Sequence, residues 1–208
     1  MVFHPRRDEH GKPVSLVHPS QPTHLSAWAD PTAVATVVPD GPMPASLHGV
    51  PFEPWVDVPT TSAGWSALRC GPDLDEPAFH PEDLQPAAGA VILEPDGRVW
   101  LVSPSNAFGG YRTTFPKGKA MHLDLRVTAV KEAFEETGLR VELVGHLLDV
   151  RRSTSHTRYY LARRLGGTPA AMGWESQAVH LAPLAQAKAL LNRAVDHPLV
   201  DRLLALGI

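Results

Sequence analysis

Short runs of alternating apolar and polar residues fill the second half of the chain, a pattern typical of half-buried strands. Ala87–Leu93 and Val99–Val102 flank the turn Pro95-Asp96-Gly97, which predicts a β-hairpin. Further strands are expected at 113–115, 141–150, 157–162 and 176–181, with a loop at 163–171. Apolar residues at helical spacing predict helices over 184–194 and 197–206. This mixture predicts an α+β fold with helices packed on a mixed sheet.

A longer helix is predicted to begin near Asp124 and to end at Thr137. The Asp124 carboxylate can cap the first turn, and Gly138 can take the left-handed conformation that ends a helix. The apolar stripe of this helix consists of Leu123, Val127, Val130 and Phe134.

Three acidic residues of this helix, Glu132, Glu135 and Glu136, are spaced i, i+3 and i+4 and therefore share one face. Like charges on one face oppose helix formation by a few tenths of a kcal/mol per pair, roughly, so a cation is expected there. Hard oxygen ligands favour Mg²⁺, Mn²⁺ or Ca²⁺ over zinc. The alternative is a solvated acidic face on which Lys131 pairs with Glu135.

A glycine-rich, basic segment, 108–119, lies directly before the acidic helix. Backbone N–H groups and cations in such a segment can bind phosphate, which makes Arg112, Lys117 and Lys119 candidate phosphate contacts. For each of these side chains, a solvated surface position is the alternative. Acids that hold a metal ion beside a basic loop suit phosphoryl chemistry.

Together these segments resemble the signature of the Nudix hydrolases, G-x5-E-x7-R-E-U-x-E-E-x-G-U, in which U is aliphatic. Its second half is matched in register by Glu132, Glu135, Glu136, Gly138 and Leu139, with Lys131 in place of arginine. The first half departs from the signature, because Asp124 stands five residues after Gly118 where the family has glutamate. Counting back from Lys131 by the spacing of the signature instead places Leu123 at the glutamate position. Either the segment between Gly118 and Lys131 is one residue shorter than in the family, or the first glutamate of the signature is absent.

The resemblance implies a Nudix α/β/α sandwich over residues 86–208 and a hydrolase that cleaves a phosphoanhydride bond in a nucleoside diphosphate linked to another moiety. Phe-Pro-Lys-Gly-Lys at 115–119 resembles family members that cleave dinucleoside polyphosphates. Mg²⁺ or Mn²⁺ is the implied cofactor, with Glu132, Glu135, Glu136 and the carbonyl of Gly118 as ligands. A nucleotide-binding regulator that keeps the fold without turnover is the alternative function.

A general base is also needed, and Glu175, in a later loop, is the candidate, with an ordinary surface acid as the alternative. Distal phosphates are predicted to contact Arg151, Arg152 or Arg158. A base is predicted to stack on Tyr111, Tyr160 or Trp174, although each could equally belong to the core.

Residues 1–85 form a proline-rich extension with short strands expected at 33–38 and 47–52, and 72–86 reads as a linker. The extension contains Trp28, Trp55 and Trp65, which are too many large aromatic residues for a disordered tail. They are predicted to pack in a core, and stacking on a nucleotide base is the alternative. We expect a small cap that packs on the main domain or on a second subunit, as in a homodimer.

The resemblance implies that the partner is a small-molecule nucleotide, and the composition argues against a nucleic acid polymer or a membrane. The net charge of −3 provides no general attraction for a nucleic acid polymer or an anionic membrane. Cys70 is the only cysteine, which excludes an intrachain disulfide and a cysteine zinc cluster. No apolar run approaches membrane-spanning length and no signal peptide is recognisable, so we expect a cytoplasmic protein.

Overall fold

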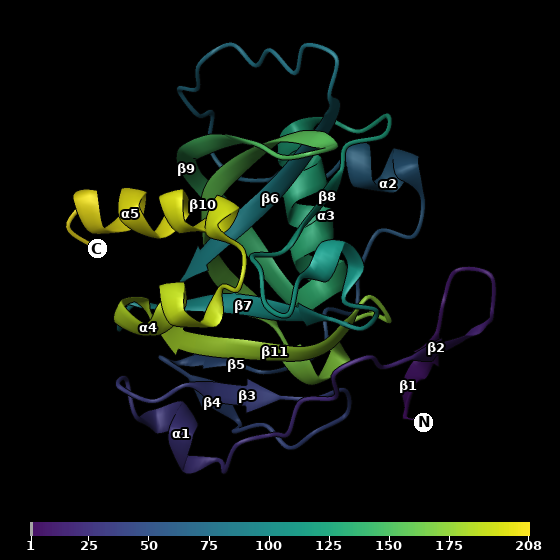
Figure 1. Ribbon diagram of the computed structural model, residues 1–208, viewed down its shortest axis with the longest axis vertical. Helices are drawn as coiled ribbons and strands as arrows, with labels where there is room; N and C mark the ends of the chain where they lie inside the picture. Colours follow the sequence, from purple (N-terminus) through teal and green to yellow (C-terminus); the bar gives the residue numbers. More distant parts are fainter. Residues whose placement is uncertain (1) are drawn as a thin grey trace.

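The computed structural model describes residues 2–208 and, at Phe108, the backbone only. Its centre is a seven-stranded mixed sheet in the order β3-β11-β7-β6-β10-β9, with β8 paired to β6 (Figure 1). The strands are β3 (Ala35–Val37), β6 (Gln85–Leu93), β7 (Arg98–Pro104), β8 (Lys117–Lys119), β9 (Leu139–Arg151), β10 (Ser155–Gly167) and β11 (Ser176–Pro183). β6 and β10 run parallel, whereas the other pairs are antiparallel.

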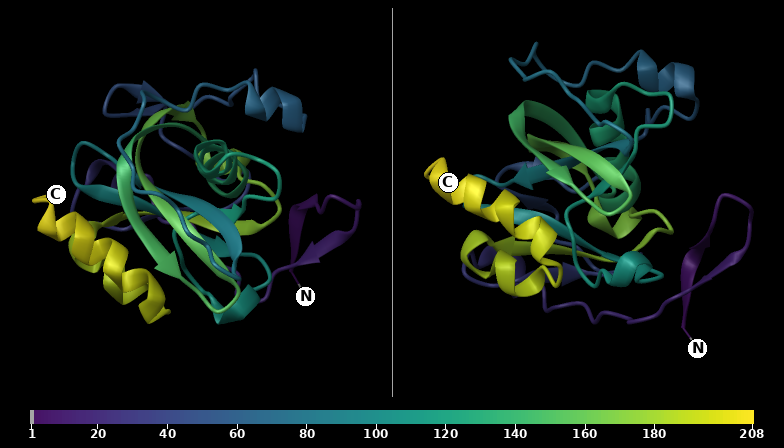
Figure 2. Two further views of the ribbon diagram at one scale, coloured as in Figure 1. Left: turned by 90° about the horizontal axis from the view of Figure 1, so that it is seen from above. Right: turned by 45° about the horizontal axis from the view of Figure 1, so that its top comes forward.

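Helices cover both faces of this sheet, as the sandwich prediction requires (Figure 2). α3 (Leu125–Thr137) packs on one face, and α4 (Leu184–Leu190) and α5 (His197–Ala205) pack on the other. The α3 core includes Val130 and Ala133 against Trp100, while Leu199 of α5 belongs to a second core with Phe115. The three-layer α+β architecture is therefore confirmed.

The remaining elements are short and lie mainly in the N-terminal part and in the turns. They are β1 (Phe3–Arg7), β2 (Pro13–Ser15), α1 (Ser26–Ala29), β4 (Ser46–Leu47), β5 (Val50–Pro51), α2 (Ser62–Ser66) and the 3₁₀ turns Phe108–Gly110, Pro169–Ala171 and Ala194–Asp196. The β1–β2 hairpin projects from the body of the molecule near the N-terminus (Figures 1 and 2). Among the described residues, no helix is both long and apolar enough to cross a bilayer.

α3 begins and ends where the sequence predicts. The side chain of Asp124 accepts a hydrogen bond of 2.8 Å from the Arg126 backbone N–H, which caps the first turn. Gly138 has φ 70°, and its N–H donates to the Phe134 carbonyl at 2.7 Å. A side chain at 138 would meet the carbonyl oxygen of Thr168 at 2.3 Å, so the turn requires glycine for space as well as for conformation.

Several strand predictions are wrong in detail. The loop expected at 163–171 is strand up to Gly167, because β10 pairs with β9 as far as Gly167 and Leu139. The strand expected at 113–115 is a single bridge between Thr114 and Val102, whereas 117–119, expected as a loop, forms β8. The strand expected at 47–52 is a hairpin, β4–β5, and the helix expected at 184–194 ends at Leu190.

The N-terminal extension contributes to the main sheet, because β3 pairs with β11 as its edge strand. Trp28 and Trp65 are buried, and Trp55 packs edge-on against Trp65 and Phe134 of α3. The prediction that these tryptophans pack in the core is confirmed.

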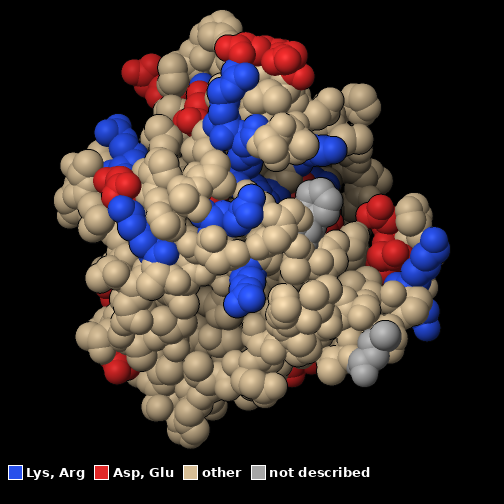
Figure 3. All heavy atoms as spheres, viewed as in Figure 1, with Lys and Arg blue, Asp and Glu red and all other residues tan. Residues whose placement is uncertain are grey.

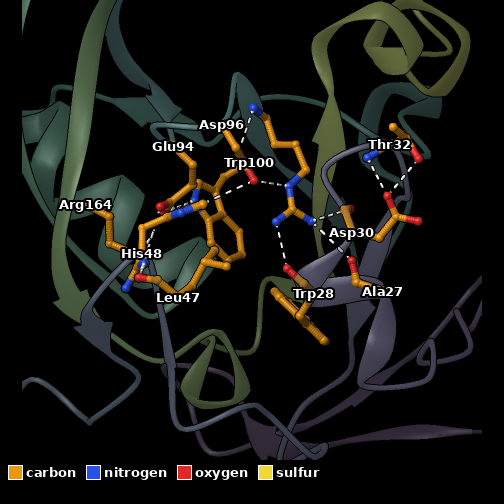
Figure 4. A network of polar contacts seen from close by, with 11 residues as sticks. Ala27, Trp28, Asp30, Thr32, Leu47, His48, Glu94, Asp96, Trp100 and Arg164 are labelled. Atoms are coloured by element: carbon orange, nitrogen blue, oxygen red, sulfur yellow. Dashed lines mark hydrogen bonds and ion pairs between the residues drawn. The ribbon is translucent and has the colours of Figure 1, made fainter.

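Two buried arginines connect the extension to the sheet (Figure 4). Arg98, which is 1% exposed, donates to the carbonyls of Ala27, Trp28 and Asp30 and forms a 2.8 Å ion pair with Asp96. Arg164 forms a 2.6 Å ion pair with Glu94 and donates to the carbonyls of Leu47 and Val50. Backbone groups of the extension thus satisfy side chains of the sheet that would otherwise be buried without partners.

Candidate active site

Two of the three α3 glutamates are buried, which the sequence did not indicate. Glu132 and Glu136 are each 9% exposed because β8 lies against their face of the helix. The backbone N–H of Lys117 donates to Glu136 Oε2 at 3.1 Å, and Gly118 lies directly against the carboxylate of Glu132. A solvated acidic face is therefore the wrong description for this pair.

Burial gives these two carboxylates unusual electrostatics. Burial, together with the charge of Glu136, raises the pKa of Glu132 to about 8. Burial also raises the pKa of Glu136 to about 7, although the nearby Lys117 cation opposes this shift. The Lys131 ammonium nitrogen lies 3.9 Å from a carboxylate oxygen of Glu132. Two buried acids that repel each other fit a divalent cation that prefers oxygen ligands. Its charge would offset both the cost of burying the two carboxylates and their mutual repulsion.

Gly118 gives the pair the space that it needs. A Cβ atom at this position would lie 2.1 Å from a carboxylate oxygen of Glu132, so a larger residue here would displace this carboxylate. In the described part of the chain, no group of three or more His, Cys, Asp or Glu side chains is arranged to hold a metal ion. The arrangement is thus a pair of carboxylates against a glycine backbone.

Glu135 and Glu175 lie at the rim of this pair. The Glu135 carboxylate forms an ion pair with Lys131 and is half-exposed. The Gly173 backbone N–H donates to the Glu135 carbonyl at 2.7 Å. This hydrogen bond fixes the turn after Gly173 at the end of α3, and Glu175 lies in that turn. Glu175 is exposed to solvent, although neighbouring atoms partly desolvate its carboxylate. This desolvation and the charge of Glu135 raise the pKa of Glu175.

The predicted phosphate contacts occupy different surroundings. Lys117 lies between Glu136 and the ring of Tyr111, with its Nζ 5.4 Å from the ring centroid. Arg112 and Lys119 are exposed, and the Arg112 backbone N–H donates to Asn192. Of the three residues, the structure brings only Lys117 into contact with the glutamate pair.

Two of the more distant predictions are wrong because the side chains belong to the interior. Arg158 is 3% exposed and forms ion pairs with Asp149 and Glu76, so it cannot reach a distal phosphate. Tyr160 is 1% exposed and donates its hydroxyl hydrogen to Glu76, which leaves no ring face for a base.

Arg193 was missed by sequence reasoning. It precedes the 3₁₀ turn Ala194–Asp196, and its guanidinium lies 5.7 Å from the Tyr111 ring centroid. The sequence predicts a helix over 184–194, which includes Arg193, and no sequence feature of that range indicates a contact with the basic segment 108–119. The hydrogen bonds of Asn192 with Arg112 and Gly110 hold this segment against the basic loop.

Comparisons with known proteins show the family to which the chain belongs. The NUDIX domain family model matches residues 83–203, which is more than half of the chain. An RNA pyrophosphohydrolase of Caulobacter vibrioides is 40% identical over 75 residues, covering 35% of this chain. The matched part spans only 41% of the length of that relative.

Solved structures give the same fold. A MutT NUDIX hydrolase from Burkholderia pseudomallei is similar with a TM-score of 0.50 and 21% identity, covering 58% of this chain and 98% of that one. A C. elegans Ap4A hydrolase binary complex has a TM-score of 0.48 and 22% identity, covering 58% of this chain and 96% of that one. The first of these likenesses supports the fold.

Proposed function

Because the chain belongs to the NUDIX domain family, whose members are pyrophosphohydrolases, we propose that it is a divalent-metal-dependent hydrolase that prefers dinucleoside polyphosphates. The bond cleaved is a phosphoanhydride in a nucleoside diphosphate linked to another moiety. The observation that carries this proposal is the pair Glu132 and Glu136, two carboxylates that are buried close to each other and whose pKa values are both raised.

The residues of the pair suit metal-assisted hydrolysis. Mg²⁺ or Mn²⁺ would be held by Glu132 and Glu136, with Glu135 and the carbonyl of Gly118 as further ligands by family resemblance. The chemistry supplied by the metal is the neutralisation of phosphate charge and the acidification of water. Lys117, beside Glu136, would contact the phosphates at the cleaved bond. Glu175, held at the end of α3, would accept the proton of the attacking water.

The preference for dinucleoside polyphosphates rests on the segment Phe115–Lys119, which resembles family members with that activity. The Caulobacter relative named RNA pyrophosphohydrolase makes RNA a second candidate substrate, whereas the net charge of −3 favours a small nucleotide. A regulator that binds nucleotides without turnover is the remaining alternative.

A substrate panel tests the proposal. The purified protein is incubated with Mg²⁺ or Mn²⁺ and a dinucleoside polyphosphate, ADP-ribose, a nucleotide sugar or 5′-triphosphorylated RNA, and the released products are separated. We expect the highest kcat/KM for the dinucleoside polyphosphate and no turnover in a chelator. Thermal stabilisation by a nucleotide without any product would instead identify a binding regulator.

We also propose the context in which this activity operates. Residues 86–208 would form the hydrolase unit and residues 1–85 its cap, and the protein would act in the cytoplasm. A homodimer remains a proposal that sedimentation equilibrium of the full chain can test.

A further inference from the structure

Three cationic side chains gather around one aromatic ring, outside the glutamate pair. The Lys117 ammonium lies 5.4 Å from the centroid of Tyr111, and the guanidinium groups of Arg152 and Arg193 each lie 5.7 Å from it. Figure 3 shows basic side chains collected on the face that carries α5 and the 108–110 turn. This tyrosine cluster, defined as Tyr111, Lys117, Arg152 and Arg193, lies next to the proposed active site because Lys117 also contacts Glu136.

Arg152 is the fixed base of the cluster. Its side chain is 6% exposed and pairs with the fully buried Asp196, which balances its charge. It donates to the hydroxyl oxygens of Tyr111 at 2.7 Å and Tyr159 at 2.6 Å. Arg152 is therefore a positioning residue that holds the Tyr111 ring in place.

Lys117 and Arg193 differ from Arg152, because among the described residues neither has a carboxylate within ion-pair distance. Arg193 is exposed, and its backbone position is set by Asn192, which bonds to the Gly110 carbonyl and the Arg112 N–H, both at 2.8 Å. The Lys117 and Arg193 cations, which both lie beside the fixed Tyr111 ring, make a site for an extended anion.

We propose that Lys117, Tyr111 and Arg193 form a subsite for phosphates beyond the anhydride that is cleaved. A chain of three or more phosphates with one end at Glu132 and Glu136 passes Lys117 and reaches Arg193. A simple diphosphate is too short to contact both. The inference rests on the proposed function and names the residues that would select nucleotides with a long polyphosphate chain.

Binding of inorganic phosphates tests this subsite without turnover. Calorimetry in a chelator compares the Kd of tripolyphosphate with that of pyrophosphate. We expect wild-type protein to bind tripolyphosphate about tenfold more tightly, as one additional charge-assisted hydrogen bond would give. Arg193→Gln should reduce this ratio to about one, and Arg193→Lys, which keeps the charge, should restore part of it.

Arg202→Gln is the matched control, because Arg202 is exposed on α5 and its loss changes the net charge equally. This variant should keep the wild-type ratio. A ratio near one in wild-type protein, or a ratio unaffected by Arg193→Gln, would overturn the subsite.

The two proposals fail differently. Absence of hydrolysis on every substrate, with the tripolyphosphate ratio intact, would reject the proposed function and retain an anion site. Metal-dependent hydrolysis, combined with a ratio of pyrophosphate to tripolyphosphate Kd values that Arg193→Gln does not change, would reject the subsite alone.

Discussion

Acidic side chains in two regions of this molecule have opposite surroundings. Below the N-terminal extension, Glu94 pairs with Arg164 and Asp96 with Arg98. Burial raises the pKa of Asp96, but the backbone and side-chain bonds from Arg98 outweigh it and leave this pKa lowered. On α3, by contrast, Glu132 and Glu136 are buried against each other, and their pKa values are raised to about 8 and 7.

The difference separates charges that hold the structure together from charges that we propose to be functional. An arginine bound to a carboxylate and to backbone carbonyls completes its own hydrogen bonding, so the network of Figure 4 fastens the extension without any ligand. The α3 pair, by contrast, consists of two carboxylates with raised pKa values, and we propose that a divalent cation completes it. The comparison therefore predicts that breaking the first region costs stability, whereas breaking the second costs activity.

The largest expected effect is on stability, at Arg164. Arg164→Met leaves the 3% exposed Glu94 without its cation, so we expect the free energy of unfolding to fall by about 3–5 kcal/mol. Urea unfolding followed by tryptophan fluorescence measures it. Arg163→Met is the control, because Arg163 is adjacent to Arg164 and pairs with Glu142 at the surface. This substitution should cost less than about 1 kcal/mol. Equal losses in both variants would remove the contrast between the regions.

The next effect is on turnover, at Glu136. Glu136→Gln keeps the shape but removes a charged ligand, so kcat/KM for a dinucleoside polyphosphate should fall at least about 100-fold. Glu142→Gln, which removes an acid from the surface of β9, should keep wild-type kinetics. Unchanged turnover in Glu136→Gln would show that this carboxylate is not a ligand.

The pH dependence of stability sharpens the same contrast. Without metal, folded Glu132 and Glu136 keep their protons up to about pH 7–8, while the unfolded chain loses them near 4.5. Because the folded state binds more protons in this window, stability should fall as pH rises from 4.5 to 8. The larger share of the fall should come from Glu132, whose pKa is raised further.

Buried His180 acts in the opposite direction over part of this range. Burial lowers its pKa to about 4, so it adds stability as pH rises from 4 to 6.5. The difference between wild-type protein and the double variant Glu132→Gln/Glu136→Gln cancels this contribution. That difference should grow in favour of the variant between pH 5 and 8, and a difference independent of pH would contradict the raised pKa values.

The smallest expected effect comes from Gly118. Gly118→Ala places a methyl group against the Glu132 carboxylate, and relief of the contact should cost about 1–2 kcal/mol of stability. The shifted carboxylate should also weaken Mn²⁺ binding several-fold. Gly145→Ala, at a position with open space on β9, serves as the control in urea unfolding and metal titration.

The sequence predicted the parts that local rules decide. The cap at Asp124, the end of α3 at Gly138 and the spacing of the glutamates follow from residues within one helix. Burial of Glu132 and Glu136 was not predictable, because it depends on β8 pairing with β6 across the helix. Arg193 was not predictable either, because its contact with Tyr111 depends on how the C-terminal segment returns to the 110–112 turn.

The central claim is that the α3 pair holds a divalent cation, and a Mn²⁺ titration tests it most directly. Free Mn²⁺ is followed by electron paramagnetic resonance in wild-type protein, Glu142→Gln and Glu132→Gln/Glu136→Gln at pH 8. The account predicts a saturable Mn²⁺ site in the first two proteins and its loss in the double variant. Equal Mn²⁺ binding in all three proteins would contradict it.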